Sequence, residues 1–145
     1  METHFDPELV QRITDELKGL DGALLPILHA LQERFGYVDD RAIGIVAEGL
    51  NLSRAEVHGV VSFYHDFRRT PPRGHVIKVC RAEACQSLGG DRLYDALKTA
   101  ADAGTEITVE AVYCLGNCAL SPAALIDGRL YGRLDTATAL EKVRT

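Results

Sequence analysis

The 145-residue sequence predicts a mixed α+β or α/β protein in two parts: a helical bundle over residues 1–70, then a small α/β domain over residues 71–145. Three observations predict this fold class. Apolar residues in the first part repeat at helical spacing. The segment "RRTPPRGH", residues 68–75, holds two prolines and a glycine and cannot continue a helix, so a linker is expected there. After this segment the apolar residues come in short runs typical of strands.

Four amphipathic helices are predicted in the first part. Asp6 and Pro7 are typical of a helix start, and Gly36 is typical of a helix end. Ser53 and Glu56 form the S-x-x-E pattern of a capping box, which opens the last of the four helices. The apolar repeats place the helices at about residues 7–17, 24–35, 39–50 and 54–64.

The second part has the order strand, helix, strand, hairpin, helix. The predicted elements are a strand at 75–80, a helix at 89–104, a strand at 106–114, a hairpin at 123–132 and a helix at 135–143. Asp127-Gly128 suits the two-residue turn of that hairpin. This order is that of a thioredoxin-like α/β fold.

Charge and hydropathy exclude several classes of function. The net charge is −5, and residues 1–70 hold 7 Lys and Arg against 12 Asp and Glu. Because no basic stripe is available to neutralise phosphates, nucleic acid is not an expected partner. No apolar run approaches the roughly 18–20 residues of a membrane span, so no membrane-spanning segment is expected. The N-terminal residues lack a secretory pattern, which favours a reducing, cytoplasmic location.

All four cysteines follow predicted strands, in the segments "CRAEAC" and "CLGNC". The spacings are C-x4-C and C-x3-C, so the C-x-x-C pair of thioredoxin-type redox chemistry is absent. In a parallel strand–helix–strand unit, the carboxyl ends of both strands lie at one edge of the sheet. We therefore expect Cys80 and Cys114 to come together despite 33 intervening residues, with Cys85 and Cys118 from the adjoining loops.

Three interpretations of these cysteines remain open from the residues alone. Four thiolates can hold one structural zinc ion, usually from tighter C-x2-C turns. They can also hold a [2Fe–2S] cluster, with two thiolates on each iron. The third interpretation is that the cysteines are buried small hydrophobic residues. A histidine-ligated Rieske centre is excluded, because all five histidines lie at or before position 75.

The sequence also resembles a known family. The similarity lies in "GVVSFYHDF", "PPRGHVIKVCRAEACQSLGG" and "VEAVYCLGNCALSPAALIDGRLYGRL". These segments resemble the 24-kilodalton subunit family of respiratory complex I, which includes related subunits of NAD-linked hydrogenases and formate dehydrogenases. The most specific part is C-x4-C followed by C-L-G-x-C, carried here by Cys80, Cys85, Cys114 and Cys118 with Leu115 and Gly116.

The resemblance implies a thioredoxin-like ferredoxin whose four cysteines bind one [2Fe–2S] cluster. It implies a partner flavoprotein subunit that binds FMN and NADH and exchanges single electrons with the cluster. The "CRAEACQ" loop departs from the Gly/Thr-containing loop of many respiratory members. It is most similar to the gamma subunit of soluble, molybdenum-containing, NAD-dependent formate dehydrogenase, which implies a molybdenum catalytic subunit in the same complex. The chain alone is not expected to be catalytic.

Other functions and residue roles stay open beside this interpretation. The rival functions are the equivalent subunit of a hydrogenase or of respiratory NADH:quinone oxidoreductase, a zinc-stabilised interaction module without redox chemistry, and a free-standing ferredoxin. Phe63 and Tyr64 are interpreted either as core residues or as contacts with the flavin subunit. His58 is expected to be a surface or packed side chain. Arg81 is either an exposed loop charge or a positive charge that raises the potential of the cluster.

Overall fold

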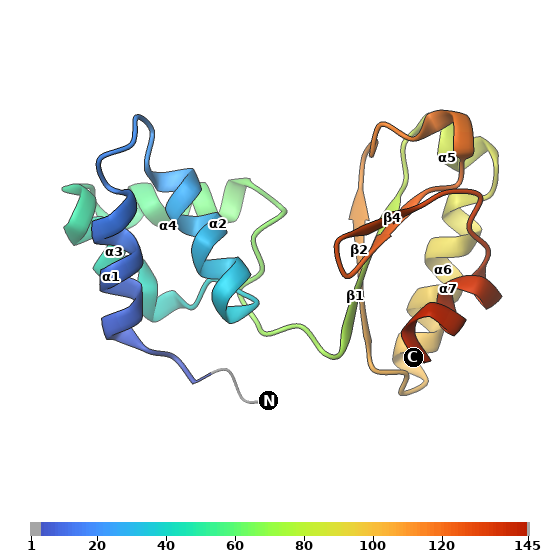
Figure 1. Cartoon of the computed structure of the whole chain (residues 1–145), viewed down its shortest axis with the longest axis horizontal. Helices are drawn as coiled ribbons and strands as arrows, with labels where there is room; N and C mark the ends of the chain where they lie inside the picture. The colour runs from blue at the N-terminus through green and yellow to red at the C-terminus, as the bar shows by residue number, and fades with distance from the viewer. Residues whose placement is uncertain (1–3, 145) are drawn as a thin grey trace. The chain divides into compact units, whose positions relative to one another are not determined.

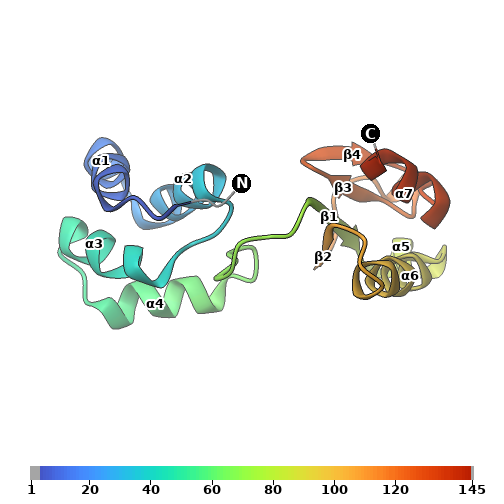
Figure 2. The same cartoon turned by 90° about the horizontal axis from the view of Figure 1, so that it is seen from below.

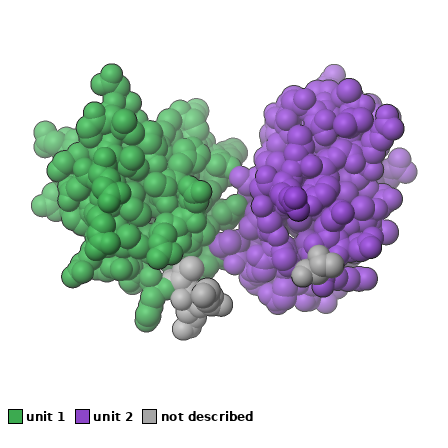
Figure 3. All heavy atoms as spheres, viewed as in Figure 1, with its two compact units in different colours: residues 1–71 green, residues 72–145 purple. Residues whose placement is uncertain are grey.

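The structure, a computed structural model, describes residues 4–144. The chain divides into two compact units, residues 1–71 and 72–145, which are coloured green and purple in Figure 3. Each unit has a hydrophobic core of its own. Nowhere in residues 4–144 does a helix combine the length and the apolar character that crossing a bilayer requires.

The described part of the first unit contains the four predicted helices (Figures 1 and 2). The Asp6 carboxylate accepts the first N–H groups of the first helix, and Gly36 ends the second in the left-handed conformation, at φ 84°. Both hydrogen bonds of the capping box between Ser53 and Glu56 are present. The helices are α1 (Pro7–Leu17), α2 (Leu24–Phe35), α3 (Asp40–Leu50) and α4 (Arg54–Phe63).

The core of this unit lies where the apolar stripes of the four helices meet. Helix α1 packs against α3 at Gly49, where an added Cβ would come within 2.6 Å of Thr14 Cγ2. Thr14 is fully buried, and its hydroxyl donates to the Val10 carbonyl at 2.8 Å, so its burial leaves no unpaired polar group. The core residues include Val10, Ile27, Leu31, Val46 and Val57.

Gln32 holds the segment that follows α4 against α2. Its side-chain amide donates to the Asp66 carbonyl at 2.6 Å and accepts the Arg68 N–H at 2.7 Å. The Arg68 carbonyl in turn accepts the N–H of Val38 at 2.7 Å. The predicted linker, residues 68–75, is therefore bound at its start to the helical unit.

Two aromatic side chains at the end of α4 are exposed to solvent. Phe63 is 74% exposed and Tyr64 is 43% exposed, and their rings contact each other edge to face. The interpretation of Phe63 as a core residue was therefore wrong. Helix α4 ends at Phe63, and its buried residues are Val57 and Val61.

The second unit is a four-stranded sheet with strand order β2-β1-β3-β4. Strands β1 (His75–Cys80) and β2 (Ile107–Val112) are parallel, whereas β3 (Ala124–Ile126) runs antiparallel to β1, and β4 (Arg129–Tyr131) antiparallel to β3. Helix α6 (Gly90–Asp102) packs on β1 and β2, and α7 (Thr136–Arg144) packs on β3 and α6. Both helices lie on one side of the sheet in Figures 1 and 2.

Local signals and burial explain these elements. Asp127 and Gly128 both have positive φ, 48° and 81°, as a two-residue hairpin turn requires. Alternate residues of β1, Ile77 and Val79, are fully buried against the helices. The predicted fold class, a helical bundle followed by a thioredoxin-like domain, is confirmed. Two short elements were not predicted: α5 (Glu83–Ser87) and the 3-10 turn η1 (Cys118–Leu120).

The capping box makes a testable contribution to stability. Replacing Ser53 with alanine removes the acceptor of the Glu56 N–H at the start of α4. We expect Ser53→Ala to lower the free energy of unfolding by about 1 kcal/mol, measured by urea denaturation. The matched control is Ser62→Ala, an exposed serine of the same helix that caps nothing. Equal losses in both variants would contradict a capping role.

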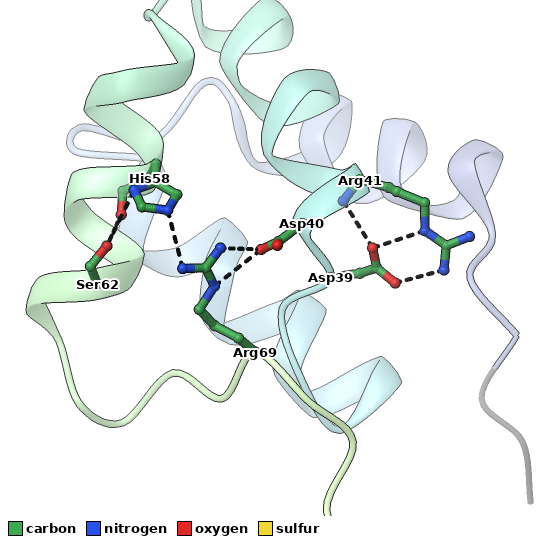
Figure 4. Close-up of polar contacts among 6 residues, drawn as sticks. All are labelled: Asp39, Asp40, Arg41, His58, Ser62 and Arg69. Atoms are coloured by element: carbon green, nitrogen blue, oxygen red, sulfur yellow. Dashed lines mark hydrogen bonds and ion pairs between the residues drawn. The ribbon is translucent and has the colours of Figure 1, made fainter.

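Asp39 contributes to the stability of the helical unit in a way that depends on pH (Figure 4). Its carboxylate caps α3 at the Arg41 N–H and pairs with the Arg41 guanidinium at 2.7 Å. It also accepts the Tyr37 hydroxyl at 2.8 Å. The hydrogen bonds from the Arg41 side chain are the main reason that the pKa of Asp39 is lowered to about 2. A carboxyl whose pKa falls on folding stabilises the folded state above its unfolded pKa, about 4. That stabilisation is lost as the pH falls through the folded pKa.

We therefore expect Asp39→Asn, which keeps a capping oxygen but removes the charge, to lower the free energy of unfolding at neutral pH. The expected loss is about 1 kcal/mol, because Arg41 is exposed and water screens its charge. The difference from the unaltered protein should shrink as the pH falls from about 4 to about 2 in urea titrations at each pH. A difference that is the same at both ends of this range would exclude the charge as its cause.

Candidate metal centre

The parallel strands place Cys80 and Cys114 at the same edge of the sheet. Cys80 is the last residue of β1 and pairs with Val112, the last residue of β2, so Cys114 follows two residues beyond. The Cys114 N–H donates to Cys80 Sγ at 3.3 Å. The two residues meet although 33 residues separate them, as expected for a strand–helix–strand unit.

Cys85 lies beside Cys80 because a short helix carries it back to the sheet. It belongs to α5, and its side chain hydrogen-bonds that of Cys80. Gly90, at the start of α6, fits closely against this turn: an added Cβ would lie 2.9 Å from the carbonyl oxygens of both cysteines. A side chain at position 90 would therefore push the two cysteines apart. Both thiols are buried, each residue being only 2% exposed.

Cys114 and Cys118 form a second pair, and this one is exposed to solvent. Their sulfur atoms are 3.6 Å apart. The loop bends sharply here, with φ 78° at Cys114 and 73° at Gly116, and the Gly116 N–H donates to Cys114 Sγ at 3.4 Å. A positive φ is uncommon for a residue with a side chain, and such conformations cluster at functional sites.

The electrostatics of the thiols link the two pairs. Burial alone would raise the pKa of Cys80, but hydrogen bonds from the N–H groups of Ala82 and Cys114 outweigh burial and hold this pKa below its usual value. The hydrogen bond with Cys114 raises the pKa of Cys118, and the charges of Cys85 and Cys80 add to that effect. The negative charges of the other three thiolates therefore act on Cys118, and bound cations would relieve this repulsion.

This donor set fits a [2Fe–2S] cluster. Such a cluster takes two thiolates on each iron, and the cysteines are arranged as one buried and one exposed pair. Backbone N–H groups already point at the sulfurs of Cys80 and Cys114, as the negative charge of a cluster requires. Within residues 4–144, no three His, Cys, Asp or Glu side chains converge as the ligands of a single metal ion.

Ser121 is a residue of the site that the sequence did not indicate. It is 6% exposed, and its Oγ lies 3.3 Å from Cys85 Sγ and 2.7 Å from the Cys118 carbonyl oxygen. It thus contacts one cysteine from each pair. A serine at this position gives no signal in the sequence, because its contact with Cys85 depends on the fold.

Asp91 compensates the positive charge of Arg81. Its Nε donates to Asp91 Oδ1 at 3.1 Å, and its guanidinium lies 4.4 Å from the centre of the Tyr94 ring. Hydrogen bonds from Gln86, and then from Arg81, lower the pKa of Asp91, so the carboxylate is ionised at neutral pH. Arg81 is therefore partly buried and ion-paired and is not an exposed loop charge, and its effect on the potential of a cluster stays a prediction.

A serine–histidine pair in the helical unit does not form a nucleophile (Figure 4). The Ser62 hydroxyl donates to the His58 carbonyl, and its Oγ lies 3.4 Å from His58 Nδ1. The other ring nitrogen faces the Arg69 guanidinium at 3.1 Å, and Arg69 in turn pairs with Asp40. A base for Ser62 would need a free ring nitrogen aimed at the hydroxyl proton, and that proton is already bound to a carbonyl.

Comparisons with known proteins agree with this geometry. Residues 10–145 match the thioredoxin-like [2Fe–2S] ferredoxin family. The NADP-reducing hydrogenase subunit HndA of Solidesulfovibrio fructosivorans is 33% identical over 134 residues, which cover 88% of this chain and 78% of that protein. An NADH-quinone oxidoreductase subunit of Mycobacterium tuberculosis is 28% identical over 96% of this chain, which spans 61% of that protein.

A solved structure is also similar to this chain. An NAD+-reducing [NiFe]-hydrogenase in the H2-reduced state matches 81% of this chain with a TM-score of 0.65 and 28% identity. The present chain spans only 21% of the length of that hydrogenase chain. The family match spans all four cysteines, and the relatives include a complex I subunit, so the resemblance to the 24-kilodalton subunit family is confirmed. This chain belongs to the thioredoxin-like [2Fe–2S] ferredoxin family.

Proposed function

We propose that this protein is the electron-transfer subunit of an NAD-linked oxidoreductase complex. In this proposal Cys80, Cys85, Cys114 and Cys118 together hold one [2Fe–2S] cluster. The observation that carries the proposal is that the two cysteine pairs meet at one edge of the sheet. There the Cys114 N–H donates a hydrogen bond to Cys80 Sγ. The family match and the NAD-linked or NADP-linked relatives support it.

Each pair has its own task in this proposal. Cys80 and Cys85 bind from the buried side, where the backbone N–H groups of Ala82 and Cys114 offset their negative charge. Cys114 and Cys118 bind from the exposed side, where a partner can approach. When bound, a cluster of this type supplies reversible transfer of one electron at a time. Hydride exchange with NAD moves two electrons, so a flavin must divide them.

The proposed partner is a flavoprotein subunit that carries FMN and binds NADH. Large apolar side chains near the cysteines in the sequence are exposed: Tyr113 (71%) precedes Cys114, Leu120 (43%) follows Cys118 by two residues, and Leu88 (61%) follows Cys85 by three. These residues belong to the same loops as the cysteines, so a protein that covered them would also bring its own cofactor close. Apolar patches of this kind are typical of protein interfaces.

For the complete assembly we propose an NAD-dependent formate dehydrogenase with a molybdenum catalytic subunit, in the cytoplasm. The support is the "CRAEACQ" loop, residues 80–86, and four free thiols, which suit a reducing compartment. A hydrogenase is the second candidate. Its support is the 33% identity to a hydrogenase subunit over 88% of this chain.

The cluster can be tested on the purified chain. We expect a red-brown protein with about two irons and two sulfides per chain, whose visible absorption bleaches with dithionite. Cys80→Ser should lose most of the bound iron, because it removes a buried thiolate. The matched control is Ser87→Ala, an exposed serine of α5 that contacts no cysteine sulfur. A colourless protein with one zinc per chain would contradict the proposal.

The identity of the assembly is a separate test. We expect the native complex, purified through a tag on this chain, to contain FMN on a second subunit and molybdenum on a third. Mass spectrometry of the subunits and metal analysis check both expectations. Nickel in place of molybdenum would reject the formate dehydrogenase in favour of a hydrogenase. Purification of the chain without a flavoprotein would reject an NAD-linked assembly.

A further inference from the structure

Ser121 is the only side-chain hydroxyl that contacts a cysteine sulfur within residues 4–144. It follows η1, and 94% of its surface is covered. Its Oγ lies 3.3 Å from Cys85 Sγ, a normal distance for a hydrogen bond to sulfur, and 2.7 Å from the Cys118 carbonyl oxygen. The hydroxyl therefore has two neighbours, one from each cysteine pair.

The hydrogen bonds between Cys85, Ser121 and Cys118 are those of a protonated Cys85 thiol that binds no metal. The Cys85 thiol donates to Ser121 Oγ, and the Ser121 hydroxyl donates its own proton to the Cys118 carbonyl. A cysteine that binds a metal is a thiolate and has no proton to donate. Ser121 Oγ and the Cys85 sulfur would then face each other as two acceptors, unless the hydroxyl proton turns toward the sulfur.

The thiolate is the stronger of the two competing acceptors. A hydrogen bond to an ionised acceptor is roughly twice as strong as one to a neutral acceptor. The sulfur is also buried, so no solvent can replace the bond, whereas Cys118 is exposed. The change needs only rotation about the Cβ–Oγ bond, because a hydroxyl hydrogen turns to suit its acceptor.

The backbone does not provide this donor at Cys85. Cys80 accepts backbone N–H groups from Ala82 and Cys114, and Cys114 accepts one from Gly116. The printed contacts of the Cys85 side chain within residues 4–144 are with Ser121 Oγ and with the Cys80 side chain, and neither is with a backbone N–H. A side-chain donor is therefore the means by which the charge of this buried thiolate is offset.

We propose that the Ser121 hydroxyl donates a hydrogen bond to the Cys85 thiolate in the cluster-bound protein and thereby raises the reduction potential. This inference rests on the proposed function, because it needs the cluster. Reduction adds one negative charge to the bound group, and a hydrogen bond to a ligand sulfur stabilises the more negative state. Ser121 is thus a positioning and tuning residue, and is not a ligand.

The test compares midpoint potentials in the full-length, cluster-bound chain. Three proteins are reconstituted with iron and sulfide: the unaltered chain, Ser121→Ala and the control Ser87→Ala. Each is titrated with a mediated reductant while the visible absorbance is recorded. We expect Ser121→Ala to bind the same amount of iron at a more negative midpoint potential. Ser87→Ala should match the unaltered chain, because its hydroxyl bonds only the Ala84 carbonyl.

A second hydroxyl-free variant, Ser121→Gly, guards against a change caused by the alanine methyl. We expect it to shift the potential in the same direction. A midpoint potential that stays unchanged in Ser121→Ala overturns the inference and leaves the proposed function intact. Loss of the cluster in both hydroxyl-free variants overturns it too, because a tuning bond is not needed for assembly. Failure of the unaltered chain to bind iron would refute the proposed function itself.

Discussion

The parallel pairing of β1 with β2 is the constraint on which the candidate site depends. Its register runs from His75 opposite Ile107 to Cys80 opposite Val112. A slip by one residue would turn Ile77 and Val79, both fully buried, away from the helices that cover them. The hydrophobic core therefore fixes the register, and the register in turn fixes which residues stand at the carboxyl edge of the sheet.

The two cysteine pairs at this edge have different surroundings. The buried pair is surrounded by Ala82, Val112, Leu115 and Ala123, whereas the exposed pair lies in a loop that bends at Cys114 and Gly116. A non-glycine residue at positive φ costs roughly 1–3 kcal/mol, so the fold must hold Cys114 in place. The hydrogen bond from its N–H to Cys80 Sγ does so, and it joins the strained loop to the end of β1.

The helical unit is stabilised by interactions of its own. Its core, its capped helices and the Gln32 amide, which binds the backbone at Asp66 and Arg68, all lie within residues 4–71. These interactions keep the chain compact as far as the prolines at 71 and 72, where the two units divide. Phe63 and Tyr64, close to that boundary, are exposed, and the Tyr64 ring contacts the buried Phe67 ring.

The sequence by itself determined the elements that local chemistry controls. The capping box of Ser53, the helix end at Gly36 and the turn at Asp127 each depend on residues within a few positions, and each was predicted from them. The four cysteines were also evident as candidate ligands, because their number and spacing are unusual. The short elements α5 and η1 were missed, since five and three residues are too few to show a hydrophobic period.

Only the tertiary structure decided which cysteines are buried, and which side chains adjoin them. Ser121 reaches Cys85 across 36 positions, and Asp91 of α6 compensates the charge of Arg81, which follows β1. Spacing along a chain cannot reveal such contacts, because they depend on how the strands and helices pack. The spacing of the cysteines marked them as candidate ligands, but the parallel sheet and its loops set the surroundings of each pair. A hydrogen bond or a charge acts over only a few ångströms, so these surroundings depend on the tertiary structure.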